Sequence, residues 1–301
     1  MKNRLSNFDA LKITAMLLII LGHVITYPNL ISNTSGYIST ILEIIFFALC
    51  VHVNIFILIT GYFQIDKEFK WKKVFSLLFK VVFYKIFISL ILYFFSPFNI
   101  SLKDLLIELI PFNLESYWFI ASYIFLYILS PYLNLIINKL SAKELKKYIL
   151  VLLLIFSLIP CLSLNLFFKN NGYTLYQFIL MYSIGAYIKK ENIVDKIKNI
   201  KFKRLKLIAV FLISLLINYS IFKIISWLKI ENNNFLFNTL YEIIYKHKFD
   251  YSNIFMIIQS ISIFLLFSTF NIRNKLINIL ILQSNKITSL QVAALSSYEN
   301  N

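Results

Sequence analysis

The sequence predicts an all-α, polytopic integral membrane protein with about eight or nine transmembrane helices. Composition is the first observation: 59% of the residues are hydrophobic, only 15% are charged, and the mean hydropathy is +0.75. Soluble domains are roughly 45–50% apolar and about 25% charged. The second observation is that the apolar residues gather in repeated runs about as long as the roughly 20 helical residues that cross a bilayer. A soluble fold is therefore excluded, and the bilayer is the expected environment.

Eight of these runs are long enough to be spans. We expect them near residues 12–30, 44–63, 76–96, 117–138, 148–167, 173–188, 207–228 and 251–270. A further run at 276–282 is too short to cross, and 101–112 has the pattern of a short amphipathic helix lying in the membrane interface. No linker or soluble domain interrupts the series, so residues 1–301 are expected to form a single membrane domain.

Positive charge alternates between the loops. Thirty Lys and Arg residues against 14 Asp and Glu residues give a net charge of +16. That excess would suggest a nucleic-acid partner in a soluble protein, but here the cations fall in every second loop between apolar runs. They are dense before the first span and in 67–73, 139–147, 189–206 and 273–275. The positive-inside rule then predicts a multi-pass plasma-membrane protein with a cytoplasmic N-terminus, and no nucleic-acid partner.

The two cysteines carry no chemical signal. Cys50 and Cys161 lie within or at the end of apolar runs, far apart and without disulfide or metal-ligand spacing. We therefore expect packing residues, no metal site and no bound cofactor.

One face of the first span carries the strongest chemical signal. His23 lies in its outer half among apolar neighbours, and ionisable residues inside a bilayer are costly and face the bundle interior or a wet cavity. Lys12 precedes His23 by close to three helical turns, so the two side chains share one face about 16 Å apart along the axis. Asp9 lies on the same face. His23 is either an acid–base catalyst or a residue satisfied by a neighbouring helix, and Lys12 is either a ligand contact or a positive-inside anchor.

Other candidates lie in the second and fourth spans. His52 falls at a depth similar to that of His23, about 10–12 Å below the outer surface, so the two can share a cavity. Alternatively, His52 only hydrogen-bonds Asn54 or a facing backbone group. Tyr117 and Trp118 open the fourth span, where they either contact a ligand or form an aromatic belt. Gly61, at the inner end of the second span, allows close backbone approach.

These stretches resemble the acyltransferase-3 family of membrane proteins. The matching residues are Phe8, Asp9, Lys12, Gly22 and His23; Asn54, Phe56, Gly61 and Tyr62; and Tyr117, Trp118, Tyr127, Ser130, Pro131 and Asn134. The resemblance covers about residues 5–290. Its most specific part is the first span, because the family has a basic residue and a histidine there with ten residues between them, as Lys12 and His23 have.

The resemblance implies an acyltransferase that moves groups other than amino-acyl groups, typically an acetyl group onto a hydroxyl. It implies that His23 acts in acyl transfer and that Lys12, where the family often has arginine, helps to bind or orient the donor beside Asp9. The outer candidates His52, Asn54, Tyr117 and Trp118 would then lie near the acceptor. Acetyl-CoA or another acyl-CoA is the expected donor, an envelope carbohydrate or a small hydroxyl compound the expected acceptor, and the lipid bilayer the third partner.

The family continues beyond a segment like 284–290 into a further apolar span. Residues 291–301 are short and polar here, so we expect the family's last span to be missing or replaced.

A different class of function is a non-enzymatic carrier or flippase for a lipid-linked saccharide. In such a protein the histidines would form a proton relay and Lys12 would anchor a headgroup. Carriers of this kind often contain inverted repeats, and a comparison of 1–140 with 141–270 shows no matching broken helices or charged positions. A membrane scaffold is a third reading, and it would leave the Lys12–His23 spacing unexplained.

Overall fold

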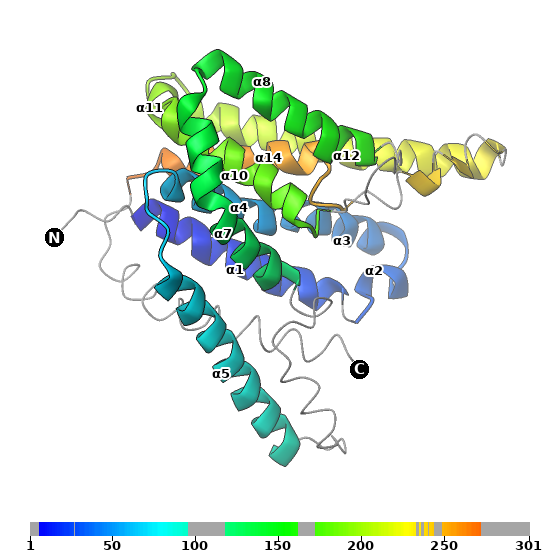
Figure 1. The fold of residues 1–301 in the computed structure, drawn as a ribbon. Coiled ribbons are helices and arrows are strands. Elements are labelled where there is room, and N and C mark those ends of the chain that lie inside the picture. The colour runs from blue at the N-terminus through cyan, green and yellow to red at the C-terminus, as the bar shows by residue number, and fades with distance from the viewer. Residues whose placement is uncertain are drawn as a thin grey trace. The chain divides into compact units, whose positions relative to one another are not determined.

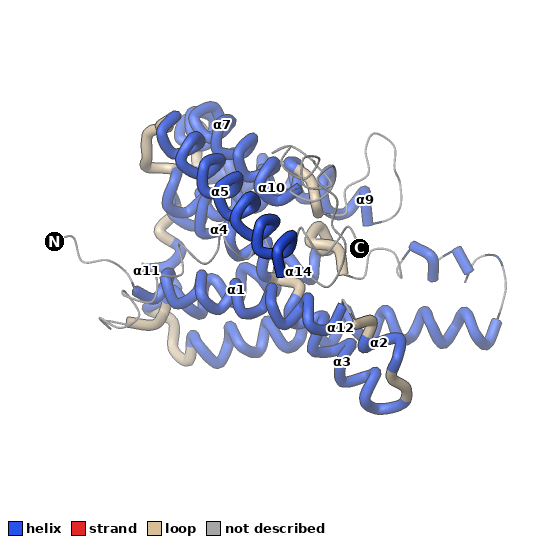
Figure 2. The backbone as a smooth tube through the Cα atoms, turned by 90° about the horizontal axis from the view of Figure 1, so that it is seen from below, coloured by secondary structure: helices blue, strands red, loops and turns tan. Residues whose placement is uncertain are grey.

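The structure is a computed structural model, and it describes residues 6–26, 28–95, 118–161, 172–232, 235, 238–239, 241–243 and 249–271. All regular structure in this part of the chain is helical, and it contains no strand (Figures 1 and 2). The predicted all-α membrane helix bundle is confirmed.

The helices follow one another without large insertions. Their bounds are α1 Ser6–Thr26, α2 Leu30–Asn33, α3 Gly36–Leu49, α4 His52–Gln64, α5 Trp71–Phe95, α7 Trp118–Lys139, α8 Ala142–Leu153, the π-helical turn η1 Leu154–Leu158, α9 Ile159–Cys161, α10 Leu175–Lys190, α11 Ile193–Lys198, α12 Lys203–Asn232 and α14 Ile254–Ser268. Each of the eight expected spans coincides with one or more of these helices. The expected interfacial helix at 101–112, the short run at 276–282 and the tail at 291–301 lie outside the described residues.

The expected external loop at 31–43 was wrong in its second half. Residues from Gly36 onward form α3, and the helix breaks only at Cys50 and Val51 before α4 begins. The prediction failed because Glu43 marks this stretch as polar. In the structure the Glu43 carboxylate is buried and pairs with the Lys223 ammonium of α12 at 2.6 Å, so its charge is compensated inside the bundle.

Four helical stretches in the described residues are long and apolar enough to cross a membrane. They are Asn7–Thr26, Gly36–Gln64, Trp118–Lys139 and Lys203–Leu228. Helix α14 is apolar but has only 15 residues, and α5 includes several lysines. The count of eight or nine spans stays a prediction.

The chain divides into two compact units. The first contains the described residues of 6–67 and 132–271, and the second contains those of 68–131. In the second unit, α5 packs against the first part of α7 through an apolar cluster centred on Val74, Ile124 and Tyr127. Each unit therefore has its own core.

In the first unit, α4 is the central helix. It packs against α10, α1 and α14, and α12 packs against α14 (Figure 1). The α4–α10 crossing is so close that a Cβ on Gly61 would overlap the Tyr182 carbonyl, and a Cβ on Gly185 would overlap the Leu58 carbonyl. The close approach predicted at Gly61 is confirmed, and Gly185 is its partner.

Candidate functional site

The candidate site begins with α1, which runs unbroken from Ser6 to Thr26. Over the eleven residues from Lys12 to His23, an α-helix rises about 16 Å and returns to within about 20° of its starting direction. Both side chains are partly buried. The unbroken helix thus places a cation near one end of the bundle and an imidazole near the other, on one face.

Asp9 lies next to Lys12 on this face. Its side chain is buried, and its Oδ1 lies 3.8 Å from the Lys12 ammonium, which is 38% exposed. A pair this long and this exposed contributes little to stability. It leaves the ammonium available to a stronger anion.

An aromatic cluster fixes the start of α1. The Phe8 ring stacks on Tyr62 of α4 at 5.3 Å and contacts Phe264 of α14, also at 5.3 Å between ring centroids. The Asn7 side-chain amide donates to the Phe267 carbonyl at 3.1 Å. These contacts hold the residues on either side of Asp9 against two neighbouring helices.

The break between α3 and α4 positions His52 at the opposite end of the bundle. Because α3 ends at Leu49, the carbonyl of that residue has no helical partner of its own. It accepts a bond from the Val51 N–H at 2.8 Å and lies 2.9 Å from His52 Nδ1. The other ring nitrogen of His52, Nε2, lies 3.0 Å from the Tyr251 hydroxyl.

These two contacts define the tautomer of His52. A carbonyl can only accept, so Nδ1 carries the hydrogen, and Nε2 then accepts from the Tyr251 hydroxyl. The predicted alternative of a backbone partner therefore matches the geometry, whereas Asn54 is not a partner of His52. His23 lies within electrostatic range of His52.

Asn54 belongs to a separate buried network. Its side-chain amide donates to the Tyr251 carbonyl at 2.9 Å, and Gln177 of α10 donates to Asn54 Oδ1 at 3.0 Å and to the same carbonyl at 2.8 Å. Asn54 and Gln177 are fully buried, and Gln177 Oε1 has no hydrogen-bond partner. The network ties α4, α10 and the residues before α14 together and presents one unsatisfied acceptor in the interior.

The aromatic candidates at the start of the fourth span do not enter this geometry. Tyr117 lies outside the described residues. Trp118 begins α7 in the second unit, where its ring meets Phe119 edge-on at 5.8 Å. The site described here is built from first-unit residues alone.

Sequence reasoning did not single out Gln177 or Tyr251. A lone glutamine in the apolar run 175–184 is a signal that could have marked the first of them. Tyr251 gives no such signal, because a tyrosine at the end of a span is ordinary. Both residues acquire a role only through partners more than 70 positions away in sequence.

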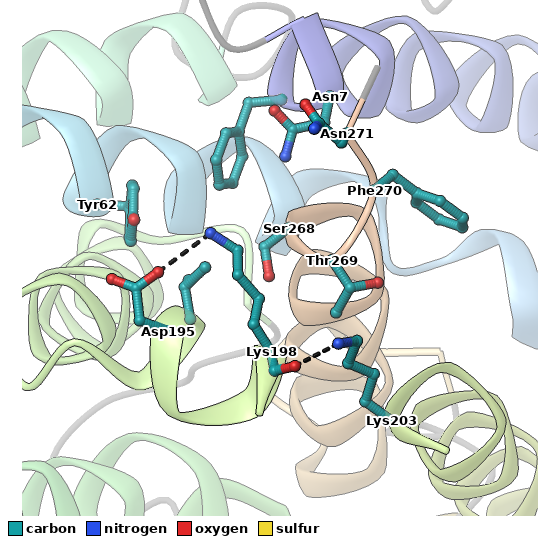
Figure 3. A pocket seen from close by; sticks show the side chains of 11 residues that line it. Asn7, Tyr62, Asp195, Lys198, Lys203, Ser268, Thr269, Phe270 and Asn271 are labelled. Carbon is teal, nitrogen blue, oxygen red and sulfur yellow. Dashed lines mark hydrogen bonds and ion pairs between the residues drawn. The ribbon is translucent and has the colours of Figure 1, made fainter. Parts of the chain in front are cut away.

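A cavity of about 520 Å³ opens beside the start of α1 (Figure 3). Its walls are the first turn of α1, the end of α4, α11, the first residue of α12 and the residues after α14. Two lysines, Lys198 and Lys203, line it together with one carboxylate, Asp195. This end of the bundle therefore offers cations around an open volume, in line with the anionic ligand expected near Lys12.

The fold and these residues define a helical membrane protein with an intramembrane histidine and a basic cavity on one helix path. The chain matches the acyltransferase-3 family, described as an acyltransferase domain, over residues 5–296, and it belongs to that family. No curated protein and no solved structure matches it. The chain is thus a membrane protein of an acyltransferase family.

Proposed function

We propose that this protein transfers an acetyl-type group from a cytosolic acyl-CoA to a hydroxyl group of an envelope sugar or a related acceptor. The observation that supports this most directly is the arrangement on α1, where Lys12 and His23 share one face of an unbroken helix and Asp9 is buried beside Lys12. The orientation we propose, with the N-terminus in the cytoplasm, follows from the loop charges and places Lys12 on the donor side.

In the proposed reaction His23 is the general base. Its imidazole takes the proton of the acceptor hydroxyl as the oxygen attacks the thioester carbonyl carbon. A carbon–oxygen bond forms, the carbon–sulfur bond breaks, and the departing thiolate takes the proton from the imidazolium. Lys12 binds or orients the anionic donor, and Asp9 keeps the ammonium near the helix when no donor is bound.

The outer network has a supporting part in this proposal. His52 and Tyr251 are hydrogen-bonded to each other, and Asn54 and Gln177 are locked in the same region. Such groups give the acceptor region a fixed shape. Gln177 Oε1 is an acceptor that a sugar hydroxyl can satisfy.

The test is replacement of His23 by Ala, with Val24→Ala as the matched control because Val24 is its exposed neighbour on α1. Membranes holding equal amounts of each variant are incubated with radiolabelled acetyl-CoA and fractionated into lipid, polysaccharide and small molecules. We expect His23→Ala to lower transfer by about 10²–10⁴-fold, the usual cost of losing acid–base catalysis, and Val24→Ala to have little effect. A His23→Ala protein that turns over near the parental rate would refute the assignment.

A further inference from the structure

We infer that the cavity beside the start of α1 binds the phosphate groups of a nucleotide-bearing acyl donor, with Lys198 and Lys203 as the phosphate-binding cations. This inference rests on the proposed function, since it concerns the donor of that reaction. It adds a binding site away from Lys12 and His23, and it names the part of the donor that occupies it.

The first step is the local geometry of the two lysines. Lys198 ends α11 and Lys203 begins α12, and Phe202 between them has a positive φ of 57°. A bulky residue rarely adopts that conformation, and here it reverses the chain sharply between the two helices. As a result, both lysines line one cavity, and the Lys203 ammonium donates to the Lys198 carbonyl (Figure 3).

The neighbouring arginine supports the cavity wall rather than filling the cavity. Arg204 Nη2 donates to the Thr269 carbonyl at 3.3 Å, and its guanidinium lies 4.5 Å from the centre of the Phe270 ring. These contacts join the start of α12 to the residues after α14. The opening between the two elements is therefore braced.

The second step is charge. The segment 189–206 holds eight Lys and Arg residues against Glu191 and Asp195. Within the cavity, the Asp195 carboxylate pairs with Lys198 at 3.1 Å, but both side chains remain well exposed, at 72% and 48%. An exposed pair of this kind contributes little to stability, so a multiply charged phosphate can replace the carboxylate as the partner of Lys198.

The third step excludes the base of the nucleotide from the aromatic wall. Phe8 and Tyr62 are both buried, and they stack on each other. The Lys189 ammonium also lies over the Tyr62 ring, 5.3 Å from its centre. Neither ring offers an open face for stacking, so the cavity provides cations for phosphate and no platform for an adenine ring.

The last step is length. Phe8 lines the cavity and precedes His23 by fifteen residues on α1, which is about 22 Å along the helix axis. A donor whose phosphates lie in the cavity must therefore carry its acyl group at the far end of a long arm. A nucleotide-linked thioester has that form, and a short acyl phosphate does not.

The experiment measures binding of coenzyme A to the purified full chain in nanodiscs of zwitterionic lipid. The variant Lys198→Gln/Lys203→Gln removes both cavity cations. Its control, Lys143→Gln/Lys146→Gln, removes the same charge from exposed positions on α8. We expect the cavity variant to bind coenzyme A about 10- to 100-fold more weakly, and the control and Lys198→Arg/Lys203→Arg to bind like the parent.

Pantetheine, which lacks the phosphates, serves as the second probe, and its binding should be equal in all variants. Coenzyme A that binds the cavity variant as tightly as the parent, or does not bind the parent, would overturn the inference. If the cavity lysines serve anionic lipid headgroups instead, the variant will lose affinity only for discs with anionic lipid, which also overturns it. Loss of coenzyme A binding in the variant, with no acyl transfer by the parent, would support the cavity assignment and reject the proposed function.

Discussion

Replacing Gly61 by Ala should separate α4 from α10 and disturb the outer network at a distance. The Cβ would overlap the Tyr182 carbonyl, which is backbone and cannot rotate away. Overpacking of a rigid contact costs about 1–3 kcal/mol. Alanine also has a better helix propensity than glycine, which returns about 0.5–1 kcal/mol.

The hydrogen bond that joins the same two helices raises the expected cost. Asn54 lies two turns from Gly61 on the same face of α4, and Gln177 lies about two turns from Gly185 on α10. If the helices separate, the 3.0 Å bond between Asn54 and Gln177 lengthens and leaves buried amide atoms unpaired. Such a loss costs about 1–3 kcal/mol. We therefore expect a net destabilisation of about 2 kcal/mol or more, or several degrees in melting temperature.

Gly22→Ala is the matched control, because a Cβ there would meet only the Phe46 ring, at an ordinary 3.9 Å. It should leave the melting temperature unchanged or raise it slightly. The assay is thermal melting of both variants in the same detergent at the same scan rate. If Gly61→Ala melts no lower than Gly22→Ala, the close crossing is not a rigid backbone contact and the reasoning fails.

Three further predictions concern single side chains. Tyr251→Phe leaves His52 Nε2 without its donor and should cost about 1–3 kcal/mol in the same melting assay, whereas Tyr37→Phe at an exposed site should cost nothing measurable; equal melting of the two would contradict the tautomer assignment. Lys12→Ala should raise the apparent KM for the acyl donor with a smaller change in kcat, as initial rates at varied donor will show, and an unchanged KM would return Lys12 to membrane anchoring. The Ser141 hydroxyl and N–H hold the pKa of the Glu144 carboxyl below its usual range, so this carboxyl stabilises α8 above its ordinary pKa and loses that effect as the pH falls. Between about pH 7 and about pH 3 the parent should therefore lose more melting temperature than Ser141→Ala does, and equal losses would show that the cap is not coupled to folding.

The positions of the helices could be predicted because hydropathy is a local property. α5, α7, α10 and α12 each begin within five residues of the expected spans. The break between α3 and α4 could not be predicted in the same way. No proline or glycine marks Cys50 and Val51, and Glu43 has its compensating charge on Lys223, 180 positions away.

The same distinction applies to the site. The relation between Lys12 and His23 lies within one helix, so the helical repeat was sufficient to place them on one face. The contact of His52 with Tyr251 depends on how α4 and α14 pack, and the Asn54–Gln177 contact depends on the glycine crossing of α4 and α10. Sequence spacing carries no information on these pairings. The cavity lysines were visible only as members of a basic loop, since the turn at Phe202 gives no sequence signal.

The two intramembrane histidines are unequal in the proton chemistry that they can perform. His52 has one ring nitrogen committed to a backbone carbonyl and the other to a tyrosine hydroxyl. Protonation of Nε2 would force Tyr251 to reverse its hydroxyl or lose the bond, and both changes would occur in a fully buried region where an unmatched donor is costly. His52 is therefore suited to hold a neutral, fixed geometry. The proton-accepting step falls to His23, which lies on the helix face that leads back to Lys12 and the cavity.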